Sequence, residues 1–157
     1  MTFSAQFRQA TTKTRQREVA QFLYEQAVTL EDDKTAQYVM FDEAIKMAVR
    51  AHSVRLVEKY TKDLSRSFTV DYFAQLAIYF KAMAKESLGV MGRALLSQAA
   101  IDATNAAMLQ ENLKPATELV RIAVSQSARI RDMSLRKQAL SLRTSVRTRN
   151  RQWKEMQ

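Results

Sequence analysis

The chain has 157 residues, of which 46% are hydrophobic and 26% are charged, with two glycines, one proline and no cysteine. A chain of this length can bury roughly 70% of the surface that its unfolded form exposes, so we expect a folded core without disulfide or metal support. Charges interrupt every apolar stretch, and no segment approaches the roughly 20 apolar residues that a bilayer crossing needs. Residues 1–8 lack the apolar middle of a secretory signal, so any export signal would lie upstream or have been removed. The sequence therefore does not indicate the cellular compartment of the protein.

The composition is typical of an all-helical protein, because Gly and Pro are scarce while Ala, Leu, Met, Gln, Lys, Arg and Glu dominate. The first 12 residues are expected to form a loose segment. Apolar residues at steps of three and four, together with start and stop signals, then predict seven helices. Their approximate bounds are Lys13–Leu30, Asp33–Ala51, Val54–Ser67, Asp71–Ser87, Met91–Gln110, Asn112–Arg131 and Met133–Lys154.

The helix starts repeat along the chain. Asp33, Asp71 and Asn112 are each expected to cap a helix, at spacings of 38 and 41 residues, and Ser53 is a further candidate cap. Each of the three starts is followed by a second helix after a short turn. This pattern favours stacked antiparallel helix hairpins, a right-handed solenoid of the tetratricopeptide kind, within a single domain. A compact bundle of seven helices would give similar signals.

One stretch, from Glu25 to Asp71, resembles the alanine-rich helical region of large multidomain bacterial proteins, and the similarity continues more weakly to about Arg131. The residues that carry it are the acidic pair Asp32 and Asp33, the aromatic Tyr38, and the ending Phe68, Val70 and Asp71. At the turn, Ala51-His52-Ser53 replaces the usual glycine. The resemblance implies a tetratricopeptide-like module beside other domains of a larger, exported protein, and it implies no reaction.

Catalytic and metal-binding signatures are missing from the sequence. The only histidine, His52, has no accompanying nucleophile motif, so we expect it to pack at a helix end. The acidic run Glu31-Asp32-Asp33 lacks the spacing and glycine of a calcium loop, so helix capping explains it better. We therefore expect no enzyme activity, no metal and no cofactor. An enzyme built from Asp, Glu, Lys and Tyr is the remaining alternative.

The net charge of +9 is concentrated in the last 29 residues. Residues 1–128 contain 16 basic and 14 acidic side chains, whereas residues 129–157 contain nine basic and two acidic ones. On the last helix, 132–157, an apolar face that ends at Trp153 is predicted to pack. A basic strip lies beside that face and comprises Arg136, Arg143, Arg147, Arg151 and Lys154. This strip is either a solvated end cap or a site for an acidic partner, nucleic acid or an anionic membrane surface.

The function that the sequence favours is a non-catalytic scaffold that binds a protein or peptide in a concave groove. The first helix of each hairpin would line that groove. Its candidate residues lie away from the apolar stripes of those helices: Tyr38, Asp42, Lys46, Tyr72, Gln75, Tyr79, Glu118, Arg121 and Ser125. The alternative is anion binding through the basic strip of the last helix. The partner and the oligomeric state are left open by the sequence.

Overall fold

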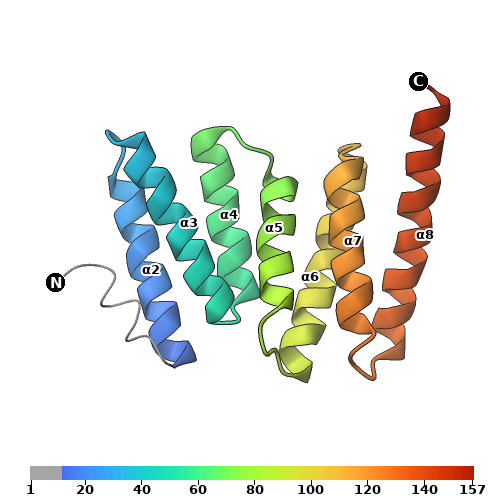
Figure 1. Cartoon of the computed structure of the whole chain (residues 1–157), viewed down its shortest axis with the longest axis horizontal. Helices are drawn as coiled ribbons and strands as arrows, with labels where there is room; N and C mark the ends of the chain where they lie inside the picture. The colour runs from blue at the N-terminus through green and yellow to red at the C-terminus, as the bar shows by residue number, and fades with distance from the viewer. Residues whose placement is uncertain (1–11) are drawn as a thin grey trace. The chain divides into compact units, whose positions relative to one another are not determined.

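A computed structural model describes residues 12–157, and within that range the protein is all-helical. Its seven helices are α2 (Lys13–Thr29), α3 (Lys34–Arg50), α4 (Val54–Phe68), α5 (Tyr72–Ala84), α6 (Val90–Leu109), α7 (Leu113–Ser127) and α8 (Met133–Glu155). Figure 1 shows their order along the chain. The predicted all-helical class and all seven predicted helices are confirmed. The expected loose segment falls almost wholly outside the described residues, and Thr12, its one described residue, caps α2 through its side chain.

The chain divides into two compact units, one ending at Tyr79 and the other beginning at Phe80, so the division falls inside α5. In the first unit, α3 packs against both α2 and α4. Its buried side chains include Phe41, Ile45 and Met47, together with alanines that let the neighbouring helices approach closely. Helix α3 is thus covered on two sides, and the three-residue link to α4 makes the two helices antiparallel.

Aromatic and polar contacts complete the packing of the first unit. The ring of Tyr24 in α2 stacks on that of Tyr60 in α4, with centroids 4.3 Å apart, and its hydroxyl donates to Asp63 at 2.7 Å. The buried amide of Gln37 in α3 donates to the carbonyl oxygen of Ala27 at the end of α2. Each bond satisfies a polar group while joining two helices, so the contacts fix the relative positions of α2, α3 and α4.

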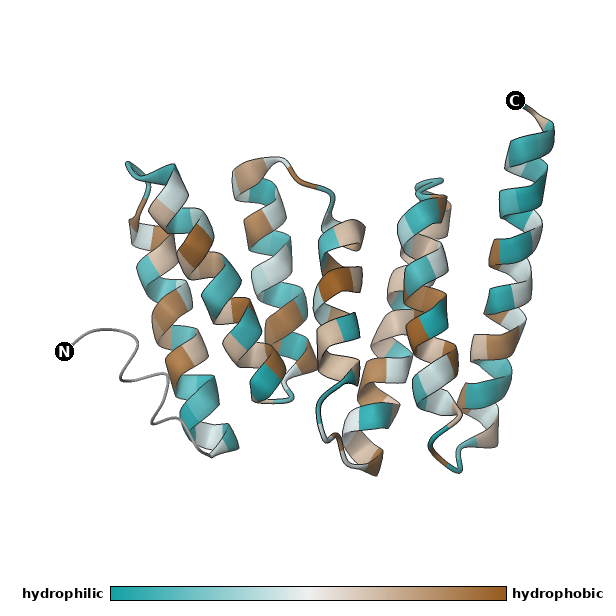
Figure 2. Cartoon of the chain, in the orientation of Figure 1, coloured by the Kyte–Doolittle hydropathy of each residue, from teal (hydrophilic) through white to brown (hydrophobic). Residues whose placement is uncertain are grey.

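In the second unit, α7 packs against both α6 and α8, and α6 also contacts α8. Small residues dominate the buried face of α6, among them Ala100, Ala103 and Ala107. Arg93 of α6 donates to the side-chain oxygen of the buried Gln126 of α7 at 2.8 Å. Pro115 lies in the first turn of α7, where its missing amide hydrogen costs little. Figure 2 shows the hydrophilic colour dominating α8, which uses only a narrow face for packing.

Helix ends differ from the predictions at four points, one of which is the end of α7 at Ser127 and not at Arg131. The side chain of Asp33 accepts from Ala36 N and that of Asp71 from Ala74 N, both at 3.0 Å, as expected of caps. Ser53 and Asn112 occupy N-cap positions without a side-chain capping hydrogen bond, so that part of the prediction is wrong. Helix α5 ends at Ala84 and not near Ser87, because the chain turns at Glu86, whose carbonyl oxygen accepts from Leu88 N at 2.8 Å.

Three helices end at a non-glycine residue with positive φ: His52 after α3, Thr69 after α4 and Glu111 after α6. A left-handed residue at this position lets the following backbone bond the last carbonyl groups of the helix, as when Ser53 N donates to Ala48 O at 3.0 Å. Glycine usually fills it because a Cβ is strained there. The positive φ of His52 therefore explains why a glycine is expected at this turn, although the sequence has none there.

Thr69 is the most strained of the three, because a β-branched side chain disfavours φ 53° and ψ 41°. We expect Thr69→Gly to raise the free energy of unfolding by about 1 kcal/mol, as measured by urea denaturation. The matched control is Ser67→Gly, two residues earlier in α4, which should lower it by about 1 kcal/mol. A loss of stability in Thr69→Gly would contradict the assignment of strain.

The two types of N-cap allow a second comparison within the first unit. Asp33→Ala removes a carboxylate that accepts from Ala36 N, so the free energy of unfolding should fall by about 1 kcal/mol. Ser53→Ala removes a hydroxyl that makes no capping bond, and its effect should stay within about 0.5 kcal/mol. Equal losses in the two variants, measured in parallel denaturations, would reject the difference between these helix starts.

Candidate functional site

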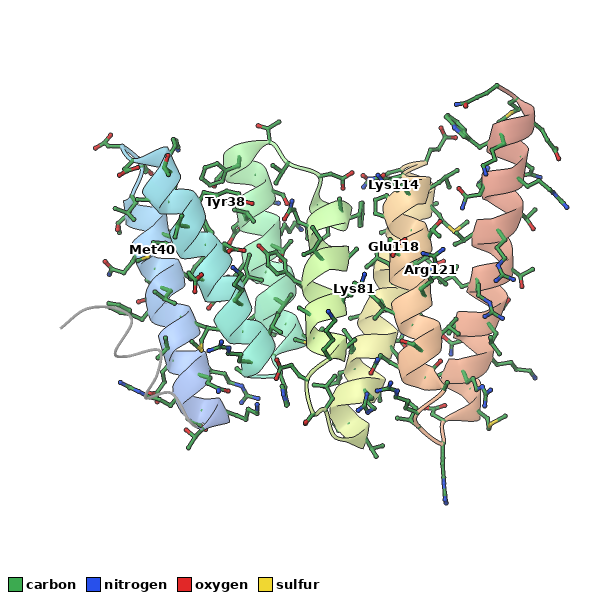
Figure 3. All side chains as sticks on the ribbon, viewed as in Figure 1. Tyr38, Met40, Lys81, Lys114, Glu118 and Arg121 are labelled. Atoms are coloured by element: carbon green, nitrogen blue, oxygen red, sulfur yellow. The ribbon has the colours of Figure 1, made fainter. Side chains whose placement is uncertain are left out.

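The predicted groove residues of the first unit lie on α3, at the start of α5 and along it. Tyr38 is 37% exposed, and its ring meets that of Phe68 edge to face with centroids 5.2 Å apart. Lys34 also lies over Phe68, with its Nζ 5.9 Å from the centre of the Phe68 ring. Tyr38 is labelled on α3 in Figure 3. These contacts hold an exposed aromatic side chain in place before any partner arrives.

Two further groove candidates on α3 form a polar chain with Tyr79. The Tyr79 hydroxyl donates to Asp42 Oδ1 at 2.7 Å, and Lys46 Nζ lies 2.6 Å from Asp42 Oδ2 and 3.7 Å from Glu43. The hydrogen bond to Asp42 raises the pKa of Lys46. Because both oxygens of one carboxylate are engaged, the side chains of Asp42 and Lys46 are fixed relative to each other.

Tyr79 departs from the prediction that placed it on an open face. Only 4% of its surface is exposed, and burial, followed by the hydrogen bond to Asp42, raises the pKa of its hydroxyl. Helical periodicity put the residue beside the apolar stripe, but a tyrosine can bury its ring and keep its hydroxyl bonded. Tyr79 therefore positions Asp42 and offers no ring to a partner. Tyr72 and Gln75 are half-buried, and burial raises the pKa of Tyr72 to about 12.

The groove candidates of the second unit lie on α7. Arg121 pairs with Glu118 at 2.8 Å, and Ser125 donates its hydroxyl to the carbonyl oxygen of Ile122. Figure 3 shows Glu118 and Arg121 following Lys114 along this helix. A pair three residues apart at the surface contributes little stability, so Arg121 can exchange Glu118 for an external anion at small cost.

The basic strip of α8 lies beside the helix face that packs. Leu135, Ala139 and Val146 are buried, whereas Arg136, Arg147, Arg151 and Lys154 are exposed and Arg143 is half-buried. Arg151 Nε lies 3.9 Å from Glu155. Within the described residues, the other four cations of the strip have no ion pair with an acidic side chain. The predicted division of α8 into a packing face and a basic face is therefore confirmed as far as Val146, whereas the packing face does not extend to Trp153.

Asn150 lies where α8 packs against α7, a line of contact that we call the seam. Its Nδ2 donates to Oγ1 of Thr117 at 3.0 Å, and Thr117 in turn donates to the carbonyl oxygen of Leu113. No sequence motif marks this pair, because the two residues come together only through the register of the helices. The hydrogen bond between Asn150 and Thr117 shows which residues of α7 lie beside the basic strip.

Trp153, predicted to pack, is 43% exposed. It lines an open pocket of about 400 Å³ with Leu113 of α7, with Arg149 and Gln152 of α8 and with Met156, which follows α8. Glu111 and Glu155 complete the lining. A separate shallow cavity of about 650 Å³ lies between α6 and α8 and is bordered mainly by polar residues of α8, including Ser134, Ser141 and Ser145.

Elsewhere, His52 occupies the helix end predicted for it, with Nε2 3.1 Å from Lys13 Nζ. The structure groups no three metal-ligating side chains among residues 12–157. None of the helices in that range is long and apolar enough to cross a membrane.

The chain matches no protein-family model, no curated protein and no solved structure. The resemblance to bacterial helical-repeat regions therefore stays a prediction.

Two half-buried tyrosines, Tyr24 and Tyr72, give the protein a distinctive response to alkaline pH. Burial, aided by the bond to Asp63, raises the pKa of Tyr24 from 10.0 to about 12, and burial raises that of Tyr72 equally. Below pH 10.0 both tyrosines are neutral in the folded and unfolded chains, so stability is unaffected. Between pH 10.0 and about 12 only the unfolded chain loses these protons, and the free energy of unfolding falls.

Urea denaturation across this pH range, with tyrosinate absorbance of the folded protein recorded in parallel, tests the shifts. We expect the loss of stability to begin near pH 10.0, and Tyr24 and Tyr72 to ionise about two pH units later than an ordinary tyrosine. Phe substitutions at these two positions should reduce the loss. Ionisation of all five tyrosines near pH 10.0 would contradict the burial described here.

Proposed function

We propose that this protein is a non-catalytic helical scaffold that binds a protein or peptide, and that the face of α3 around Tyr38 makes the contact. The observation that carries the proposal is the fixed position of Tyr38 against Phe68. An exposed aromatic ring that is already ordered loses little entropy on binding, and aromatic side chains supply much of the binding energy at interfaces.

The polar groups beside Tyr38 support a role in recognition. Asp42 and Lys46, one and two turns further along α3, present opposite charges that are held by the contact with Tyr79. An apolar anchor next to fixed polar groups is the usual composition of a specific interface. The tetratricopeptide-like arrangement of hairpins belongs to the same proposal.

A selection from a library of random peptides on the purified chain tests this role. We expect the selected peptides to bind Tyr38→Ala at least about tenfold more weakly, the loss that removal of an aromatic anchor causes. The matched control is Val39→Ala, because Val39 is 51% exposed and its side chain leaves α3 at a different angle. Peptides that bind both variants and the unchanged chain equally would reject the α3 face.

A second function, anion binding through α8, is supported by a separate observation. Helix α8 carries seven basic side chains and one carboxylate, Glu155, and four members of its basic strip have no ion pair within the described residues. Guanidinium groups bind phosphates and carboxylates through two parallel hydrogen bonds. The strip alone, however, does not identify the anion.

A further inference from the structure

The contact between Thr117 and Asn150 brings basic side chains of two helices together. On α7, Lys114 lies three residues before Thr117 and Arg121 lies four residues after it. On α8, Arg147 lies three residues before Asn150 and Lys154 lies four residues after it. Side chains three or four residues apart share a helix face. All four therefore lie on the same side of the seam as the hydrogen bond that joins the helices.

The direction of the helices determines how these four cations face one another. Helices α7 and α8 are antiparallel, because a turn of only five residues joins them and they pack together. Moving from the seam toward the start of α7 therefore leads toward the end of α8. Lys114 consequently lies beside Lys154, and Arg121 beside Arg147. We call these four residues the basic tetrad, with Thr117 and Asn150 at its centre.

Three carboxylates lie near the tetrad: Glu118 within α7, and Glu111 and Glu155 at the pocket that Leu113 and Trp153 line. Glu118 is paired with Arg121, while Lys114, Arg147 and Lys154 make no ion pair within residues 12–157. All four tetrad side chains are exposed. Arg143 and Arg136 continue the row along α8, one and three turns before Arg147, so the basic surface extends for about 27 Å from Arg136 to Lys154 at a rise of 1.5 Å per residue.

We propose that the basic tetrad and the adjoining row bind the phosphate backbone of a nucleic acid across the α7–α8 hairpin. This inference rests on the second function above and extends it to α7 and to one class of anion. Backbone recognition by proteins combines Arg and Lys with neutral Thr and Asn side chains, which is the composition around the seam. The extended row suits a ligand with regularly repeated charges.

The surroundings of the tetrad favour a nucleic acid over an acidic protein. Specific protein interfaces place large apolar anchors at their centre. The centre of this surface is instead a Thr and an Asn, and the exposed aromatic side chain nearest to it in α8, Trp153, lies at one end of the row, next to Lys154. Binding would therefore depend on charge, with little preference for base sequence.

The test measures anisotropy of labelled oligothymidine and of a duplex, each about 20 nucleotides long, with the full chain at about 50 to 300 mM salt. We expect binding that weakens steeply with salt. Replacing the tetrad by Lys114→Gln, Arg121→Gln, Arg147→Gln and Lys154→Gln should weaken it at least about thirtyfold, because each lost phosphate contact lowers the salt slope by about one. The two probes also distinguish a single strand from a duplex.

The matched control removes four exposed cations outside the hairpin through Arg17→Gln, Arg55→Gln, Lys62→Gln and Lys85→Gln. It lowers the net charge equally, so it should lose less than about threefold if position matters more than total charge. Glu118→Gln should have the opposite effect, because it frees Arg121, and should tighten binding several-fold. Equal losses of affinity in the tetrad variant and the control variant would overturn the proposal that the tetrad forms the binding site. Circular dichroism of each variant confirms that its helices are intact.

Further binding measurements distinguish this inference from the second proposed function, anion binding through α8, on which it rests. Lys114→Gln with Arg121→Gln changes no residue of α8, and it should weaken nucleic-acid binding by about tenfold or more if α7 takes part. An unchanged affinity would overturn the two-helix site while leaving anion binding by α8 intact. Equal or tighter binding of polyglutamate or of phosphatidylserine vesicles would overturn the choice of nucleic acid. No binding of any polyanion at low salt would overturn both proposals.

Discussion

Each unit depends on one central helix that is covered on two sides. Helix α3 lies against α2 and α4, and α7 lies against α6 and α8. A helix in this position must present apolar or small residues over a wide arc, and both do. The outer helices α2, α4 and α8 bury narrower faces, so their remaining surface is free to carry charge. The burial of α7 thus permits an unusually basic α8 beside it.

Hydrogen bonds between helices add precision to this packing. Apolar contacts alone tolerate small shifts of one helix along another, whereas a hydrogen bond between two particular polar groups permits a single register. Gln37 with Ala27 and Tyr24 with Asp63 have this effect in the first unit, and Arg93 with Gln126 and Asn150 with Thr117 have it in the second. The surfaces that we propose for binding lie beside such bonds, which explains how flexible side chains can keep a defined arrangement.

The helices could be predicted from the sequence, because apolar periodicity and capping residues are local signals. The division of α8 into a packing face and a basic face is also a local property and was predictable. The burial of Tyr79 was not, since it depends on Asp42 being placed opposite its hydroxyl by the packing of another helix. The absence of side-chain capping by Ser53 and the positive φ of Thr69 depend on turn geometry that residue type does not determine.

The basic tetrad shows most clearly what the sequence alone leaves undetermined. Lys114 and Arg121 belong to a segment of nearly balanced charge, and nothing near them in the sequence connects them with Arg147 and Lys154. The antiparallel register of α7 and α8, fixed at Thr117 and Asn150, brings the four together. Placing like charges side by side opposes folding, and salt screens this repulsion only in part. An anion that bridges the two helices would remove the repulsion, so such an anion should bind the folded hairpin and stabilise it at the same time.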